Sequence, residues 1–282
     1  MALFPSFQRV RSLRTCFCNV DRRRSVLEKG TFYPMFQHGT DGIPIIFFPA
    51  LGCDSRLGQR HHDLAFPVHW ARWVPVGDQD DFDGYAEKVA ATVEIPEDCY
   101  FAGTSLGGLV ALHLARRLKP RGVILIGSMH SSAVVAPAMQ WLVNSVIRFM
   151  PNALVHLDWM PRWVVDRQFG LTADPHVELL LDMVRQHHGS DLRRLCQLAL
   201  SVPRPIEPAC PVLSIHGTED KILSYFEDEI DIPIRGAGHF ISLTHPGEVN
   251  RAIRNFVEMV DCGVWHESLY HTLLGSRLQK TA

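Results

Sequence analysis

A serine between two glycines, in the stretch FAGTSLGGLVALHL at 101–114, is the first group in the chain that suggests chemistry. Ser105 lies between Gly103 and Gly107, where an apolar run meets a helical repeat. One interpretation is a nucleophile on a sharp strand-to-helix turn, which needs small neighbours because the strand and helix backbones crowd it. The other is a serine that caps the helix. This short pattern alone fits both.

A serine hydroxyl is a weak nucleophile at neutral pH, so it needs a base, and the base needs an acid to orient it. Both residue types occur later in the chain. Asp220 ends the stretch HGTED, and His239 ends the stretch GAGH. Ser105, Asp220 and His239 each follow a predicted strand, so we expect the three to meet and to attack a carbonyl carbon. Glu219, beside Asp220, is an alternative acid.

Short apolar runs alternate with helical patterns, and these elements must position the three groups. Buried strands are predicted at 43–50, 98–105, 122–128 and 210–217, with a weaker candidate at 69–76. Helices are predicted at 83–93, from Leu106 to Pro120, and at 252–260. This alternation predicts a mainly parallel sheet with helices on both faces. In such sheets, ligands bind at the carboxyl ends of the strands.

An insertion of about 80 residues lies between the predicted strands at 122–128 and 210–217. Its pattern is helical throughout, which predicts a helical lid at 129–208 over the carboxyl edge of a core at 31–128 and 209–261. Some large side chains in it are candidates either to line an apolar pocket or to pack the lid on the core: Met139, Trp141, Met150, Trp159, Met160 and Trp163. His130 is a further candidate to face the pocket.

Composition excludes several classes of protein. The formal net charge is −2, so the chain lacks the basic character of a nucleic-acid binder. Seven scattered cysteines argue against a secreted disulfide framework and favour a cytoplasmic protein. No apolar run is long enough for an integral membrane segment. Neither the cysteines nor the histidine doublets have the spacing of a metal site.

The two ends of the chain lie outside the predicted core and lid. Residues 1–30 form a basic N-terminal segment, with six arginines among the first 24 residues. This segment is either a solvated tail or an organelle-targeting sequence. Residues 262–282 form a C-terminal extension whose role the sequence leaves open, as it does the oligomeric state.

With these motifs, the chain resembles the α/β-hydrolase superfamily over about residues 43–260. The matching stretches are FFPALGCDSRL (47–57), GTSLGG (103–108), HGTEDKIL (216–223) and GAGHF (236–240). The resemblance implies that Ser105 is the nucleophile, His239 the base and Asp220 the acid. It also implies an oxyanion hole formed by the backbone N–H groups of Leu51 and Leu106.

The chain departs from some members of that superfamily. Pro49-Ala50 stands where many members have His-Gly, and the His-Gly-Gly-Gly form of one lipase and esterase branch is absent. A serine rather than an aspartate at position 105 argues against haloalkane dehalogenases and epoxide hydrolases, which form an alkyl-enzyme ester.

The resemblance implies a serine hydrolase that cleaves a carboxylic ester or thioester of a small, fairly hydrophobic substrate through an acyl-enzyme intermediate. It implies no metal and no organic cofactor, a small-molecule partner and no nucleic acid. A carbon–carbon bond hydrolase remains open. Two other functions also stay open: a receptor or binding protein that keeps the three residues but turns over slowly, and an acyltransferase.

Overall fold

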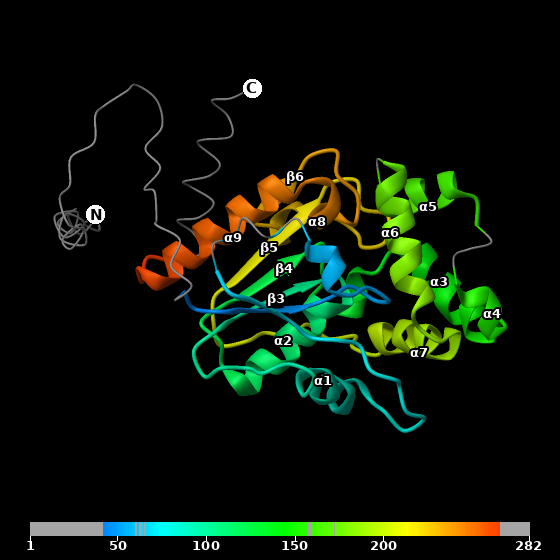
Figure 1. Ribbon diagram of the computed structural model, residues 1–282, viewed down its shortest axis with the longest axis horizontal. Helices are drawn as coiled ribbons and strands as arrows, with labels where there is room; N and C mark the ends of the chain where they lie inside the picture. Colours follow the sequence, from blue (N-terminus) through cyan, green and yellow to red (C-terminus); the bar gives the residue numbers. More distant parts are fainter. Residues whose placement is uncertain are drawn as a thin grey trace, which may run out of the picture. The chain divides into compact units, whose positions relative to one another are not determined.

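The structure is a computed structural model that describes residues 42–265 apart from 60, 62, 63, 65, 157–159 and 172 (Figure 1). The chain divides into two compact units, and all described residues belong to the second, Gly39–Ala282. The predictions for the basic segment 1–30 and for most of the extension 262–282 therefore lie outside the described residues. No helix within the described ranges combines the length and the hydropathy needed to span a bilayer.

A parallel sheet organises the described part of the chain. In spatial order its strands are β2 (Val68–Trp70), β1 (Ile45–Phe48), β3 (Tyr100–Thr104), β4 (Val123–Ile126), β5 (Val212–Gly217) and β6 (Ile232–Ile234). Every neighbouring pair is parallel, which confirms the predicted sheet. Because β1, β3 and β4 are buried along their whole length, they appear in the sequence as continuous apolar runs.

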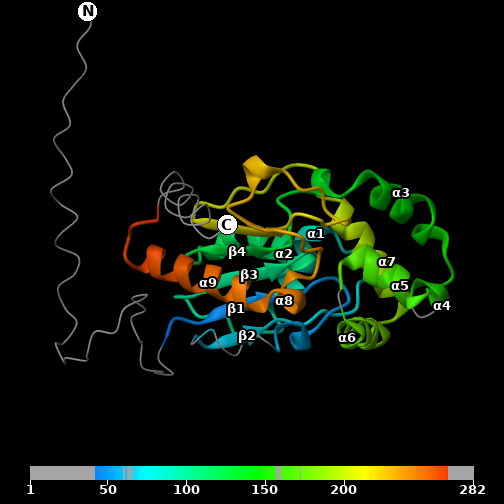
Figure 2. The same ribbon diagram turned by 90° about the horizontal axis from the view of Figure 1, so that it is seen from above.

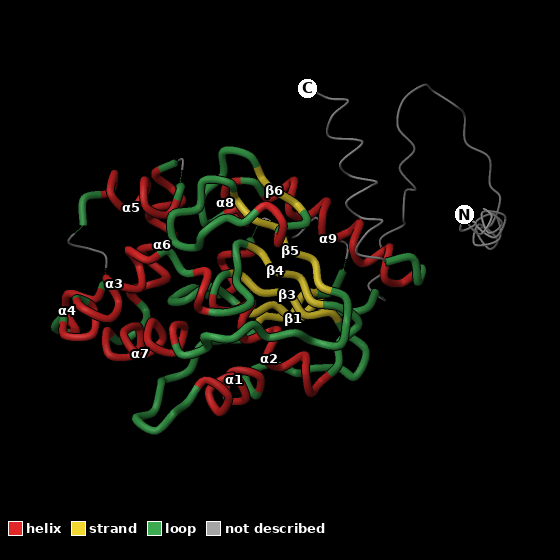
Figure 3. Tube along the Cα trace, turned by 180° about the vertical axis from the view of Figure 1, so that it is seen from behind, coloured by secondary structure: helices red, strands yellow, loops and turns green. Residues whose placement is uncertain are grey.

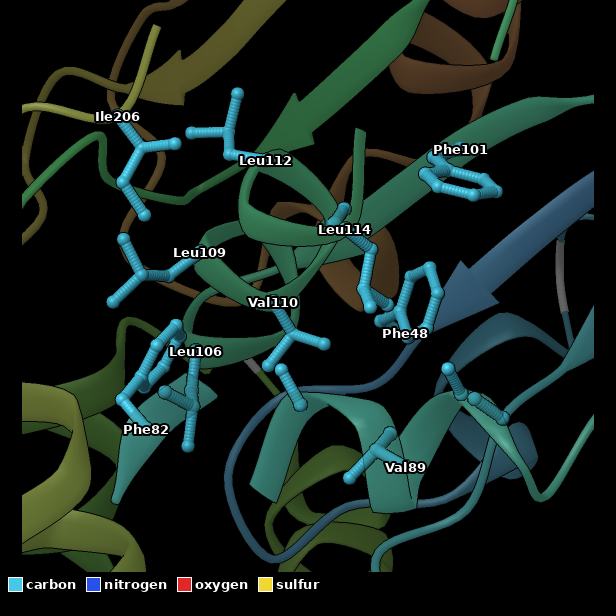
Figure 4. Packing of buried hydrophobic residues seen from close by; sticks show 14 of the residues in the cluster. Phe48, Phe82, Val89, Phe101, Leu106, Leu109, Val110, Leu112, Leu114 and Ile206 are labelled. Carbon is cyan, nitrogen blue, oxygen red and sulfur yellow. The ribbon is translucent and has the colours of Figure 1, made fainter. Parts of the chain in front are cut away.

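Helices cover both faces of this sheet (Figure 2). On one face lie α1 (Phe82–Ala90) and α2 (Leu106–Leu118), and on the other α8 (Ile241–Thr244) and α9 (Pro246–Asp261). Successive side chains of β1 point to opposite faces of the sheet, so Phe48 packs in the α1–α2 layer and Phe47 in the α9 layer. Figure 4 shows the first layer, in which Phe48 and Phe101 lie beside Leu114 of α2.

The insertion between β4 and β5 is helical (Figures 1 and 3). Its helices are α3 (Pro137–Ser145), α4 (Asn152–Val155), α5 (Arg162–Phe169), α6 (Asp174–Arg185) and α7 (Gly189–Leu200), with short 3-10 turns η3 (Ser132–Val134) and η4 (Ile147–Phe149). A third apolar cluster joins α6 and α7 to the sheet side through Leu57 of η1 (Ser55–Gly58) and Phe240.

The two edge strands differ from the sequence prediction. The strand expected at 69–76 is only β2, because Trp73 leaves the sheet to donate from its indole N–H to the carbonyl of Ala50 at 2.8 Å. Pro75 then has no N–H to extend the ladder. At the other edge, β6 contains Pro233, a residue that sheets tolerate mainly on edge strands.

Candidate active site

Ser105 lies on the turn from β3 to α2. Its backbone has φ 54° and ψ −122°, and residues other than glycine rarely adopt a positive φ. A Cβ at Gly107 would collide with the carbonyl oxygen of Phe48, and one at Gly103 with the backbone of Gly107, so both positions require glycine. Although Ser105 occupies the N-cap position of α2, its side chain makes no capping hydrogen bond. The helix-cap interpretation is therefore wrong.

His239 lies in the loop after β6, and its ring contacts the other two predicted groups. Its Nε2 is 2.9 Å from Oγ of Ser105, and its Nδ1 is 2.7 Å from Oδ2 of Asp220. The His239 backbone N–H donates to the carbonyl of Phe169 at 3.1 Å, which ties the loop to α5. The residue is only 2% exposed. The structure thus brings Ser105, His239 and Asp220 into one hydrogen-bonded chain.

Asp220 lies in the loop after β5, and both of its carboxylate oxygens have partners. Oδ1 accepts from the backbone N–H groups of Ile222 at 2.7 Å and Leu223 at 3.0 Å. Burial would raise the pKa of this carboxyl, but the neighbouring His239 and His216 outweigh burial and hold the pKa below its usual range. Glu219, the alternative acid, is exposed.

His216 also contacts Asp220, although its sequence pattern did not predict a place in the site. It lies on β5, is 1% exposed, and its Nε2 is 3.1 Å from Oδ2 of Asp220, the same oxygen that His239 contacts. Its Nδ1 has no hydrogen-bond partner among the described residues. No sequence pattern marks this contact, because a position on a strand does not identify the loop residue that it meets.

Three further residues, on β4 or just after it, support the serine turn. Ser128, just after β4, donates from its hydroxyl to the backbone carbonyl of Ser105 at 2.6 Å. The Ser105 N–H in turn donates to the carbonyls of Ile126 at 3.3 Å and Gly127 at 3.2 Å. These bonds hold both the N–H and the carbonyl of Ser105, so they fix the backbone of the turn.

Leu51 and Leu106 are the residues whose backbone N–H groups the resemblance assigns to the oxyanion hole. Leu106 is the first residue of α2, where backbone N–H groups have no partner within the helix. Leu51 lies in a tight turn that is closed by the Cys53 N–H donating to the carbonyl of Ala50 at 2.9 Å. The same carbonyl accepts the indole N–H of Trp73, which fixes the turn in place. Both leucines line the cavity that Ser105 faces.

That cavity has a volume of about 650 Å³, within the range of sites for small molecules. Ser105 and His239 form part of its lining, and most of the rest is apolar and comes from the insertion: Met129, Val135, Ala138, Met139, Trp141, Leu142, Val143, Ile147, Val155, Met160, Phe169, Leu180, Val184, Leu192, Cys196, Ala199 and Leu200. Gln168 and Lys221 add polar groups. Among the described residues, no Asp or Glu lines it.

The predicted pocket residues divide into two groups. Met139, Trp141 and Met160 line the cavity. Met150, Trp163 and also His130 do not belong to its lining, and Trp159 lies outside the described residues. No cluster of His, Cys, Asp and Glu within the described ranges has an arrangement that would hold a metal ion.

Comparison with known proteins agrees with this architecture. Residues 75–229, more than half of the chain, match the family described as "Serine aminopeptidase, S33". No curated protein sequence matches the chain. Solved structures with a similar fold include an esterase from Thermogutta terrifontis (19% identity, 78% of this chain, 90% of that chain, TM-score 0.57).

A second is an enol-lactonase from Burkholderia xenovorans LB400 (18% identity, 79% of this chain, 94% of that chain, TM-score 0.60). A third is a structure from Nitrososphaera gargenis described with carboxylesterases (13% identity, 79% of this chain, 92% of that chain, TM-score 0.58). These likenesses show the fold. Together with the family match they lead to one conclusion: the chain belongs to the serine aminopeptidase S33 family and is an enzyme of the α/β-hydrolase type.

Proposed function

We propose that the protein is a serine esterase that hydrolyses a carboxylic ester or thioester of a small, fairly hydrophobic substrate. The observation that carries the proposal is the chain of contacts from Ser105 through His239 to Asp220, at 2.9 and 2.7 Å, on the wall of an apolar cavity. In this proposal the insertion at 129–208 is the lid that supplies the other walls.

The first half of the reaction forms an acyl-enzyme. As Oγ of Ser105 attacks the carbonyl carbon, Nε2 of His239 takes the hydroxyl proton, and Asp220 holds the ring and stabilises its positive charge. The backbone N–H groups of Leu51 and Leu106 donate to the oxyanion. His239 then gives its proton to the leaving alcohol or thiol as the bond from carbon to that group breaks.

The second half repeats these steps with water. His239 takes a proton from the water as its oxygen attacks the acyl carbon, and returns a proton to Oγ as the ester bond to Ser105 breaks. The products are the carboxylic acid and the free serine. Asp220 remains ionised throughout, which agrees with a pKa held below its usual range by the two histidines despite burial.

The lining favours an ester over the N-terminal peptide bond that the family description suggests. An aminopeptidase substrate carries a free ammonium group, and such a cation needs a carboxylate partner when it leaves water. The described cavity lining contains no Asp or Glu, and its one Lys or Arg is Lys221, a cation. An uncharged acyl chain fits the apolar walls without this cost. The fold shared with esterases is consistent with this choice.

The test is hydrolysis of 4-nitrophenyl esters with acyl chains from short to long. Ser105→Ala is expected to lower kcat by at least about 10⁴-fold, since the nucleophile and its base act as a unit. Ser145→Ala, an exposed serine at the end of α3, is the matched control and is expected to match the wild type.

Three outcomes would contradict the proposal. Equal activity in the wild type and Ser105→Ala would remove the assigned nucleophile. No hydrolysis of any ester or thioester by the wild type would favour a binding protein with slow turnover. A new ester formed when an alcohol is added, at the expense of the free acid, would favour acyl transfer.

A further inference from the structure

The insertion exposes large apolar side chains on its outer side. Trp141 is 64% exposed, Phe149 76% and Leu154 46%, on α3, η4 and α4. Residues 137–155 are mostly apolar, yet only Val143 among them is buried. We call residues 137–155 with these three side chains the apolar face.

The elements that carry the apolar face are neighbours in the fold. The helices α3 and α4 and the turn η4 between them all pack against α7. In Figures 1 and 2 they lie together at the α7 end of the described unit, away from α9. All three elements therefore share one support, and their exposed side chains belong to one part of the insertion. A further exposed tryptophan, Trp163 on α5, is 68% exposed.

Charge is nearly absent from this surface. Between Arg121 and Asp158 the sequence contains no Asp, Glu or Lys, and its one arginine is Arg148. The guanidinium of Arg148 lies 5.8 Å from the centre of the exposed Phe149 ring. A long arginine side chain keeps its charge in water while its stem contacts apolar material. The surface therefore carries no acidic group that would have to leave water or face a phosphate.

The same segment forms a wall of the cavity that Ser105 faces. Leu142, Ile147 and Val155 line that cavity, and so does the largely exposed Trp141. Residues 137–155 thus contribute both to the exposed surface and to the cavity wall, and Trp141 belongs to both. A molecule held against Trp141 would therefore lie next to an apolar wall of the cavity.

We propose that the apolar face binds the surface of a phospholipid bilayer, with Trp141, Phe149 and Leu154 entering the boundary between headgroups and acyl chains. A few aromatic and aliphatic side chains beside an arginine suffice for such shallow binding. A second copy of the chain is a poorer fit. Each partner of a standard protein interface contributes about 20–30 residues, whereas the apolar face offers three large exposed side chains. The proposal rests on the proposed function only where it concerns delivery of an apolar substrate.

The test is flotation of the full-length protein with lipid vesicles. All proteins carry Ser105→Ala, so that binding is measured without turnover. The vesicles are pure phosphatidylcholine, because the six arginines in the first 24 residues would bind anionic lipid by themselves. Phe149→Ser combined with Leu154→Ser removes two exposed side chains that do not line the cavity. Phe226→Ser, which removes an exposed phenylalanine outside the insertion, is the matched control.

We expect the Ser105→Ala protein to float with the vesicles and the double variant to bind at least about tenfold more weakly, since each lost side chain contributes apolar burial. The Phe226→Ser protein should bind like its parent. Far-UV circular dichroism and thermal melting of the double variant establish that it is folded.

Absence of flotation, or equal flotation of the double variant, would overturn the proposal. So would a dimer in sedimentation velocity that the double variant loses while no protein floats, because the face would then be an interface between copies. Flotation without ester hydrolysis by the wild type would sink the proposed function and leave the lipid surface standing.

Discussion

The sheet and the insertion both come from apolar sequence, but they bury it to different degrees. Every residue of β3 and β4 is buried, whereas in 137–155 only Val143 is. A fully packed element has one arrangement, because interiors are dense and deform little. An element that faces solvent on one side and a cavity on the other has fewer fixed neighbours. In the proposed function, the sheet therefore fixes the reacting atoms, and the insertion determines what reaches them.

The strand ends and the insertion also differ in their hydrogen bonds. On the sheet side, Asp220 accepts two backbone N–H groups and contacts two histidines, and Ser128 holds the carbonyl of Ser105. On the insertion side, one of the longer-range links is Arg193, which donates to Asn152 Oδ1 at 2.7 Å and to the carbonyl of Met150. We expect substitutions at the strand ends to affect catalysis most, and those in the insertion to affect substrate range.

The largest effect is expected at the buried acid of the sheet side. Asp220→Asn keeps the size of the side chain but removes the charge that orients His239, so we expect kcat to fall by about 10⁴-fold. Because the pKa of Asp220 lies below its usual range, the wild-type carboxylate is ionised at every pH above about 4, so protonation of Asp220 does not mask the loss there. Steady-state kinetics on a short ester measure it.

The neighbouring acid provides the control for this prediction. Glu219→Gln removes a charge of the same sign one residue away, but Glu219 is exposed, so its kcat should stay within about twofold of the wild type. A large loss in Glu219→Gln with little loss in Asp220→Asn would transfer the role of the acid to Glu219 and break the assignment.

The strand-end site could be predicted from sequence because its backbone demands specific residues. Gly103 and Gly107 leave no room for a Cβ, and the strands before Ser105 and Asp220 are short, mostly apolar runs. In a parallel sheet all carboxyl ends meet at one edge, so order along the chain predicts proximity in space. The contact of His216 with Asp220 was missed because a histidine on a strand has no pattern that marks its partner.

The cavity wall could be predicted only in part. Met139 and Met150 belong to the same apolar stretch, yet Met139 lines the cavity and Met150 is outside its described lining. Helical periodicity shows that one side of a segment is apolar, but it cannot tell a cavity from solvent when both sides are apolar. Trp163 illustrates the same limit, since it was a pocket candidate and is 68% exposed.

A pair of identical truncations compares the two regions directly. Leu125 of β4 is 0% exposed, so Leu125→Ala should lower the free energy of unfolding by about 2–5 kcal/mol. Leu142 of α3 is half-buried and lines the cavity, so Leu142→Ala enlarges an existing space and should cost less than about 1 kcal/mol. Urea unfolding monitored by circular dichroism measures both values. Equal losses would mean that the insertion is packed as firmly as the sheet.

The last prediction, and the most informative for the insertion, concerns Cys196 of α7, where a small effect on stability is expected. Burial raises the pKa of its thiol to about 12, so the side chain is neutral and acts as a small apolar group in the cavity wall. Cys196→Leu adds volume that projects into the cavity, and it should change the free energy of unfolding by less than about 1.5 kcal/mol. The KM of long-chain esters should rise several-fold more than that of short ones.

Cys210, in the loop before β5, offers the same substitution away from the cavity lining. Cys210→Leu should leave the dependence of KM on chain length unchanged, whereas Cys196→Leu should shift the preference toward shorter chains. Such a result would mean that the wall formed by α7 limits the length of the acyl chain. If both variants kept the wild-type dependence, the acyl chain would occupy another part of the cavity. The walls formed by α3 and η4, which also carry the apolar face, would then be the region that selects the substrate.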